Sequence, residues 1–409
     1  MDHRLRPTPL AERALAPDLA RGVMLLFIAV ANTHYFVRGE RYLAGFPLDV
    51  PTLDAAVAGV VATLVDGRAF PLFSLLFGYG VAQLARRHLA AGAPWRQVGR
   101  LLRRRGLWMV PIGFLHCVLL YVGDIVAAYG LLSVLFAGAV RWRAWVPLTL
   151  AGLVLALIAF PGEADPTLED APDQYLLPPD PVTAVLVRAT VWPMLVPLLT
   201  VGLLAPFLLG VLAARRRLLE EPERHRGLLA VVAVVGIGAA VAGGLPLGLT
   251  VAGVLPLGPD IGLLDTLHDA TGYLGGPGYA AALALLAARL GQRRGAVTRA
   301  VAAVGQRSLT CYLCQSVVWT LAFAPYTLDL GDDLGVAATA ALAAGTWLAT
   351  VGLAELMRRR GMRGPAEVLL RRLTYGRVPT NGALVGWVPT NAPLVGRGQR
   401  MRRPISAQS

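Results

Sequence analysis

The feature that most constrains this chain is a succession of long apolar runs, each about the length that a helix needs to cross a bilayer. A hydrocarbon core about 30 Å thick requires roughly 20 apolar residues of α-helix. Hydrophobic residues make up 56% of the 409 residues and charged residues 15%, whereas ordinary soluble domains carry about 25% charged residues. The sequence therefore predicts an all-α fold, a polytopic transmembrane helix bundle with about ten spans.

The expected spans are bounded by charged residues or by Gly and Pro. They cover residues 19–37, 70–84, 106–122, 125–140, 145–160, 190–213, 228–251, 273–290, 308–325 and 336–356. A shorter apolar piece, 57–65, precedes the second span, and the break at 66–68 predicts a bent or re-entrant helix there.

Three further segments are expected outside the helical domain, which covers 19–357. Residues 1–18 form a cytoplasmic N-terminal segment, and 358–377 form a cytoplasmic amphipathic segment whose apolar face can lie on the inner leaflet. Residues 378–409 are dense in Pro, Gly and Asn and contain a near-repeat. We expect this tail to be disordered.

The distribution of charge along the chain predicts its orientation. All 38 cationic residues are Arg, and the formal net charge is +13. The arginines gather in every second connection, as at 86–105, 215–226 and 358–360, whereas 163–180, 260–269 and 329–333 are acidic. Arginine-rich loops are retained on the cytoplasmic side, so we expect both termini in the cytoplasm. The absence of Lys indicates the codon bias of a GC-rich bacterial genome, so we expect the membrane to be a bacterial plasma membrane. The lipid bilayer then explains the positive charge, and no nucleic-acid partner is expected.

Polar side chains inside the apolar runs are candidates for a site, because each costs a few kcal/mol in lipid. At 1.5 Å of rise per residue, Asn32 stands in the outer half of the first span and His116 at a similar depth in the third. Asp124 follows at the outer turn after His116, and Arg68 lies at the outer break before the second span. If the first four spans pack together, these residues line one cavity that opens outward.

The four residues suit the chemistry of group transfer. His116 can act as a general base near neutral pH, and a neighbouring carboxylate such as Asp124 can orient it. Arg68 can hold an anionic group such as a phosphate or a carboxylate. The alternative is structural: a lone His in a bundle often only packs, and an Arg beside an Asp is often an ion pair.

The ninth expected span carries a second polar cluster, at 307–316. Helical spacing places positions 308, 311, 312 and 315 on one face, so Tyr312 and Gln315 are candidate substrate contacts. Tight packing through interhelical hydrogen bonds is the favoured alternative.

The three cysteines do not form a known ligand pattern. Cys311 and Cys314 make a C-x-x-C pair inside an apolar run, and Cys117 is the third. An odd number of cysteines in lipid supports neither a zinc site nor a disulfide framework, so no metal is expected.

Five sequence blocks in a fixed order cover the chain from about residue 18 to 377. They are 18–22 with Asn32, then 66–78, 113–129, 304–316 and 363–377. These blocks resemble the YeiB-like family of bacterial integral membrane proteins, which carries the label domain of unknown function 418. The chain departs from the family pattern at Cys311, where Asn is usual, and at Arg68-Ala69, where Lys is usual.

The YeiB-like family is grouped with transmembrane acyltransferases. The resemblance implies transfer of an acyl group from a cytoplasmic thioester donor, such as acyl-CoA, to a small-molecule, lipid or glycan acceptor. We expect His116 to act as base, Asp124 to orient it, and Asn32 and Arg68 to bind the acceptor or an intermediate. A small-solute transporter and a non-catalytic membrane scaffold remain alternatives, although the two related halves typical of transporters are not evident.

Overall fold

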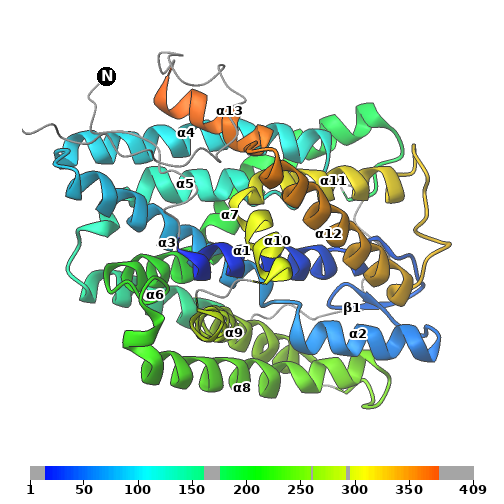
Figure 1. Ribbon diagram of the computed structural model, residues 1–409. Coiled ribbons are helices and arrows are strands. Elements are labelled where there is room, and N and C mark those ends of the chain that lie inside the picture. Colours follow the sequence, from blue (N-terminus) through cyan, green and yellow to red (C-terminus); the bar gives the residue numbers. More distant parts are fainter. Residues whose placement is uncertain (1–13, 161–175, 259–260, 292–294, 377–409) are drawn as a thin grey trace, which may run out of the picture.

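The computed structural model describes residues 14–160, 176–258, 261–291 and 295–376. Within these ranges the fold is a bundle of α-helices, with one short antiparallel pair formed by β1 (Tyr42–Leu43) and β2 (Phe46–Pro47) (Figure 1). The expected all-α class is confirmed. The residues 1–13 of the expected N-terminal segment, most of the acidic connection at 163–180 and the tail at 378–409 lie outside the described residues.

The helices follow one another along almost the whole described chain. They are α1 (Leu15–Ala31), α2 (Thr52–Leu64), α3 (Ala69–Ala90), α4 (Trp95–Leu119), α5 (Val126–Phe136), α6 (Trp145–Ile158), α7 (Pro181–Arg215), α8 (Arg226–Val251), α9 (Ile261–Leu290), α10 (Ala296–Gln306), α11 (Ser308–Phe323), α12 (Val336–Arg359) and α13 (Pro365–Tyr375). Short 3-10 turns occur at η2 (His34–Phe36), η3 (Ala137–Val140) and η4 (Pro222–His225).

Five helical stretches of the described chain are long and apolar enough to cross a membrane. They are Leu15–Phe36, Thr52–Ala90, Pro181–Arg215, Pro222–Val251 and Val336–Arg359. The stretches Val126–Val140, Trp145–Ile158 and Ser308–Phe323 are apolar but shorter. The chain is therefore a multi-pass integral membrane protein.

The predicted break before the second span is confirmed. Helix α2 ends at Leu64 and α3 begins at Ala69. Between them Gly67 has a φ of 69°, a left-handed conformation that favours glycine.

Several helices extend beyond the apolar runs that predicted them. Helix α4 begins at Trp95 rather than Gly106, and α9 begins at Ile261 rather than Tyr273. Helix α10 was not expected at all, because its region was assigned to an arginine-rich connection. Hydropathy detects only the lipid-compatible part of a helix, whereas Arg is itself a good helix former.

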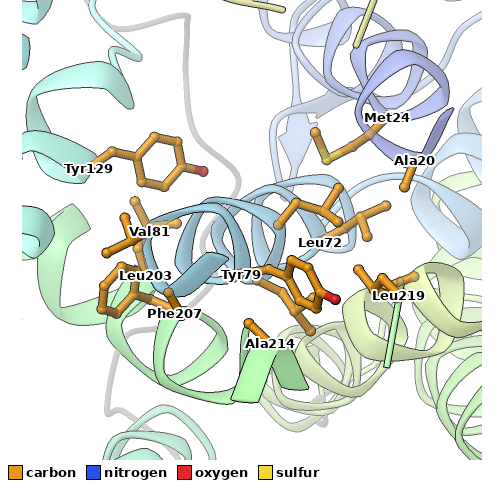
Figure 2. Close-up of a cluster of buried hydrophobic side chains, with 14 of the residues drawn as sticks. Ala20, Met24, Leu72, Tyr79, Val81, Tyr129, Leu203, Phe207, Ala214 and Leu219 are labelled. Carbon is orange, nitrogen blue, oxygen red and sulfur yellow. The ribbon is translucent and has the colours of Figure 1, made fainter. Parts of the chain in front are cut away.

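Glycines allow the backbones of α3 and α7 to approach closely. A Cβ added at Gly78 would lie 2.1 Å from the Phe207 carbonyl oxygen, and one at Gly210 would lie 2.0 Å from the Leu75 carbonyl oxygen. Small residues at such contacts are typical of helix pairs in membranes. Figure 2 shows the apolar cluster beside this contact, which includes Leu72, Tyr79, Leu203, Phe207 and Met24.

The amphipathic helix α13 packs against the bundle and contacts α4 and α11. The Glu367 carboxylate accepts hydrogen bonds from the backbone N–H groups of Leu309 and Thr310 at 2.8 and 3.1 Å, and from the Thr310 hydroxyl at 2.5 Å. A carboxylate at these free N–H groups stabilises a helix start. Helix α13 therefore fixes the N-terminal turn of α11.

Candidate active site

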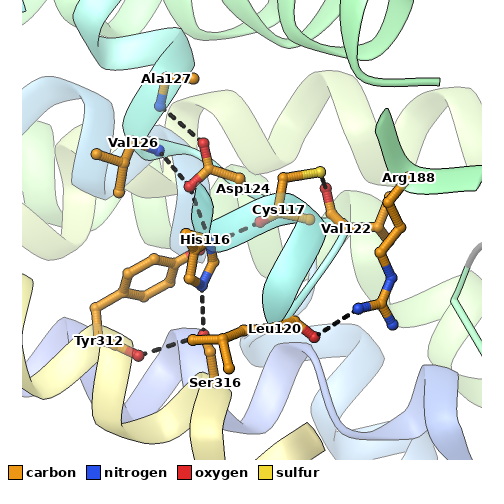
Figure 3. A network of polar contacts seen from close by, with 11 residues as sticks. His116, Cys117, Leu120, Val122, Asp124, Val126, Ala127, Arg188, Tyr312 and Ser316 are labelled. Atoms are coloured by element: carbon orange, nitrogen blue, oxygen red, sulfur yellow. Dashed lines mark hydrogen bonds and ion pairs between the residues drawn. The ribbon is translucent and has the colours of Figure 1, made fainter. Parts of the chain in front are cut away.

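His116 and Asp124, which sequence reasoning paired, are in direct contact. His116 lies in the last turn of α4, and Asp124 lies in the connection to α5 (Figure 3). The distance from His116 Nδ1 to Asp124 Oδ1 is 2.9 Å, and each side chain is only 1% exposed. A buried imidazole is thus held by a buried carboxylate.

The Asp124 carboxylate is fixed by the start of α5. Its Oδ1 accepts the backbone N–H of Val126 at 3.2 Å, and its Oδ2 accepts that of Ala127 at 2.8 Å. Gly113 on α4 makes room for this arrangement, because a Cβ there would lie 2.3 Å from both Asp124 Oδ2 and the Ala127 nitrogen. The close approach of α4 and α5 therefore determines where the carboxylate sits.

Ser316 on α11 adds a third member to the network. Its Oγ lies 2.8 Å from His116 Nε2, and Ser316 is 2% exposed. Because a carboxylate only accepts hydrogen bonds, Nδ1 carries the proton toward Asp124, and the lone pair of Nε2 faces the Ser316 hydroxyl. This is the order of contacts found in Ser-His-Asp triads.

Tyr312 lies one helical turn before Ser316 and covers the imidazole. Its ring centroid is 4.9 Å from that of His116. Its hydroxyl donates a hydrogen bond to the Gly123 carbonyl oxygen at 3.2 Å. Tyr312 thus contacts both the catalytic candidate and the connection that carries Asp124.

A cavity of about 190 Å³ has Tyr312 in its lining. Its charged lining residues are Arg21, Arg87, Arg105 and Glu367, and we call the three arginines the arginine group. Its apolar and aromatic lining includes Phe73, Phe77, Met109, Ile125, Val126, Tyr129 and Tyr312. The cavity thus combines an excess of positive charge with an apolar and aromatic surface.

This cavity is not the one that the sequence predicts, because Asn32, Arg68, His116 and Asp124 are absent from its lining. Arg87 and Arg105 of its lining belong to the arginine-rich stretch 86–105, which the charge pattern assigns to the cytoplasmic side. The outward-opening cavity stays a prediction.

Asn32 and Gln315 connect α1 to the elements around His116. The Tyr121 hydroxyl donates to Asn32 Oδ1 at 2.8 Å. Gln315 Nε2 donates to the Leu25 carbonyl oxygen at 3.2 Å. Both residues therefore border the network, and neither contacts His116 directly in the described hydrogen bonds.

Arg68 has different neighbours. Its guanidinium donates to the carbonyl oxygens of Asp66 at 2.5 Å and Ala240 at 2.7 Å. A Cβ added at Gly244 would lie 1.9 Å from Arg68 Nη2, so α8 encloses the group closely. The structure brings His116, Asp124 and Tyr312 together, and it places Arg68 against α8.

Sequence reasoning missed Ser316 as a site residue. The polar cluster at 307–316 predicts a face through positions 308, 311, 312 and 315, which leaves Ser316 out. Ser316 follows Tyr312 by four residues, so the same spacing rule places both on one side of the helix. The signal was present but weak, since serine is common in membrane helices.

No group of three His, Cys, Asp or Glu side chains within the described ranges is arranged to hold a metal ion. Cys117 and Cys311 are buried free thiols, and Cys314 is a half-buried one.

Two comparisons relate the chain to known proteins. It is 25% identical over 415 aligned positions to the uncharacterized protein YxaH of Bacillus subtilis (strain 168), an alignment that covers 91% of this chain and 96% of YxaH. Residues 213–377, which include α11 with Tyr312 and Ser316, match the family described as protein of unknown function (DUF418). This part of the chain, which is less than half of it, is similar to the DUF418 family.

Proposed function

We propose that this protein is a membrane-embedded acyltransferase that moves an acyl group from a thioester donor to an acceptor at the membrane. The observation that carries this proposal is the His116–Asp124 pair, buried beside Tyr312, which also lines a cavity that contains the arginine group. A histidine whose tautomer is fixed by a carboxylate is a suitable general base for removing a proton from a hydroxyl.

The cavity suits an amphipathic anionic donor such as acyl-CoA. Guanidinium groups bind phosphates with charge-assisted hydrogen bonds, and Arg21, Arg87 and Arg105 all line the cavity. The aromatic and aliphatic residues of the same lining, which include Tyr312, offer an apolar surface for the acyl chain. The acceptor, a small molecule, lipid or glycan, reaches His116 from the side bordered by Asn32 and Gln315. Arg68 stabilises the break between α2 and α3 that borders the bundle.

The membrane topology that we propose has about ten spans with both termini in the cytoplasm, in the bacterial plasma membrane. Contacts between connections support it. On the arginine-rich side, Arg86 forms an ion pair with Glu220. On the other side, Arg38 pairs with Asp329 at 2.6 Å and with Asp332 at 2.5 Å. Residues 19–357 then form the transmembrane domain, and 1–18 and 358–377 lie on the cytoplasmic side.

The test is a transfer assay with purified protein in lipid vesicles. Radiolabelled acyl-CoA donors of several chain lengths are supplied with a membrane lipid and glycan extract, and labelled products are separated. We expect the wild type to label an acceptor and His116→Ala to lose this activity. His225→Ala, at the far arginine-rich connection, serves as the matched control and is expected to retain it.

Two results would contradict an acyltransferase. Solute uptake driven by protons or ions, together with no transfer from any donor, would identify a transporter. Absence of both activities would favour a scaffold in which His116 and Asp124 only pack.

A further inference from the structure

We infer that Ser316 is a nucleophile that carries the acyl group covalently between donor and acceptor. This inference rests on the proposed acyl transfer and adds a second chemical step to it. In this scheme His116 removes a proton from a hydroxyl of the protein itself, as well as from the acceptor hydroxyl.

The hydrogen bonds of the neighbouring hydroxyl groups single out Ser316. The Tyr312 hydroxyl donates to the Gly123 carbonyl, and the Thr320 hydroxyl lies 3.0 Å from the Leu120 carbonyl oxygen. Only the Ser316 hydroxyl, among the described hydrogen bonds, contacts His116 Nε2. It is therefore the hydroxyl from which this imidazole can remove a proton.

Other buried serines of the bundle show what a purely structural serine does here. The Ser74 hydroxyl donates to the Leu203 carbonyl oxygen at 2.7 Å, and the Ser133 hydroxyl donates to the Leu102 carbonyl oxygen at 3.0 Å. Each connects two helices through a backbone carbonyl and has no titratable partner in the described contacts. Ser316 differs because its closest partner is a ring nitrogen that a carboxylate orients from the opposite side.

The position of Ser316 suits a protected intermediate. It lies one turn beyond Tyr312, which lines the cavity, whereas Ser316 is not among the lining residues. Figure 3 shows Tyr312 and Ser316 on the same helix, both beside His116. The proposed step therefore requires a movement that opens the cavity to Ser316. Ser316 is 2% exposed and His116 3% exposed, so both are shielded from bulk water, and such shielding protects a reactive ester from hydrolysis.

The chemistry balances without a further reactant. Ser316 Oγ attacks the thioester carbonyl carbon while His116 Nε2 takes its proton. The C–S bond then breaks, and the leaving thiolate takes that proton from His116 to depart as a thiol. In the second half, the acceptor hydroxyl gives its proton to His116 and attacks the serine ester. The C–O bond to Ser316 breaks, and His116 returns the proton to Ser316 Oγ.

The experiment omits the acceptor. Purified full-length protein is mixed with radiolabelled acyl-CoA, released thiol is measured, and the protein is digested for peptide mass spectrometry. We expect a burst of about one thiol per protein and an acyl group on Ser316. Ser316→Ala and His116→Gln are expected to lose the burst and at least about 1,000-fold of the transfer rate. Ser133→Ala is the matched control, with an unchanged burst.

Two additional measurements keep the result decisive if Ser316→Ala fails to fold. A serine-directed fluorophosphonate probe is expected to modify Ser316 in the wild type and not in His116→Gln. Ser316→Cys is expected to form a hydroxylamine-sensitive thioester at the same position.

The possible failures are distinguishable. Transfer by Ser316→Ala near the wild-type rate, with no acylated wild-type protein, would overturn the nucleophile and leave the proposed acyl transfer intact. Neither thiol release nor transfer with any donor would overturn both.

Discussion

Asp124 Oδ1 lies 2.9 Å from His116 Nδ1, and this contact determines which ring nitrogen faces Ser316. Asp124→Asn keeps the shape of the side chain but introduces an amide that can donate to Nδ1, which favours the wrong tautomer. We expect the transfer rate to fall by roughly 10³- to 10⁴-fold, as in triads of this order. The rate is measured with labelled acyl-CoA and saturating acceptor.

Asp180→Asn is the matched control for Asp124→Asn. Asp180 also accepts two backbone N–H groups at a helix start, from Val182 at 2.9 Å and Thr183 at 3.0 Å. Asn also caps helices well, so transfer should be unchanged. Equal losses in the two variants would show that helix capping, and not the orientation of His116, explains the effect.

Gly113→Ala is expected to disturb the site without removing any polar group. Its Cβ would lie 2.3 Å from Asp124 Oδ2, so α4 and α5 must separate. Overpacking of this kind costs about 1–3 kcal/mol, and we expect a lower thermal midpoint together with slower transfer. Gly152→Ala on α6 is the control, because nothing lies within 4 Å of a Cβ there. If Gly113→Ala is as stable as the wild type, the contact of α4 with Asp124 is less tight than described.

Sequence reasoning identified the parts of the site that conflict with lipid. His116 and Asp124 stood out because an ionisable group in an apolar run is costly. Ser316 did not stand out, because a serine hydroxyl in a helix can donate to a carbonyl oxygen of its own helix. The Ser316 hydroxyl also does this here, with the Tyr312 carbonyl oxygen at 3.4 Å. Its role depends on α11 packing beside the end of α4, a contact between residues 200 positions apart.

Much of the fold was also predictable, for a related reason. The apolar parts of the helices and the break at 66–68 follow from hydropathy and from Gly67. Hydropathy does not predict the starts of α4 and α9 or any part of α10. Their residues are charged or small, and these helical segments depend on tertiary packing. The cavity likewise arises from spaces between α1, α3, α4 and α13 that no single segment encodes.

The arginine group of the cavity should affect donor binding more than chemistry. Arg87→Gln removes one of three guanidinium groups, and hydrogen bonds to charged groups contribute about 1.5–3 kcal/mol. We therefore expect KM for acyl-CoA to rise roughly 10- to 100-fold with kcat unchanged. Arg217→Gln, at an exposed ion pair with Glu221 on the same side, should leave KM unchanged.

A donor without phosphates separates this effect from a general loss of structure. With a short acyl thioester of N-acetylcysteamine, Arg87→Gln and the wild type should react equally. A loss of activity with this donor as well would contradict a phosphate-binding role for the arginine group.

The orientation of the bundle is tested by single introduced cysteines. Arg216 and Asp333 are both exposed and lie in connections of opposite charge. In intact cells, a membrane-impermeant maleimide should label Asp333→Cys and spare Arg216→Cys, and cell lysis should allow both to react. The wild type, whose three cysteines are buried or half-buried, gives the background. The reverse pattern would place the arginine-rich side outside.

The most direct test of the central claim is a double-mutant cycle on the transfer rate of His116→Gln and Asp124→Asn. Residues that act as one catalytic unit are strongly non-additive. We predict that the double variant is no slower than His116→Gln alone. Losses that multiply in the double variant, or transfer by His116→Gln at the wild-type rate, would contradict a catalytic His116–Asp124 pair.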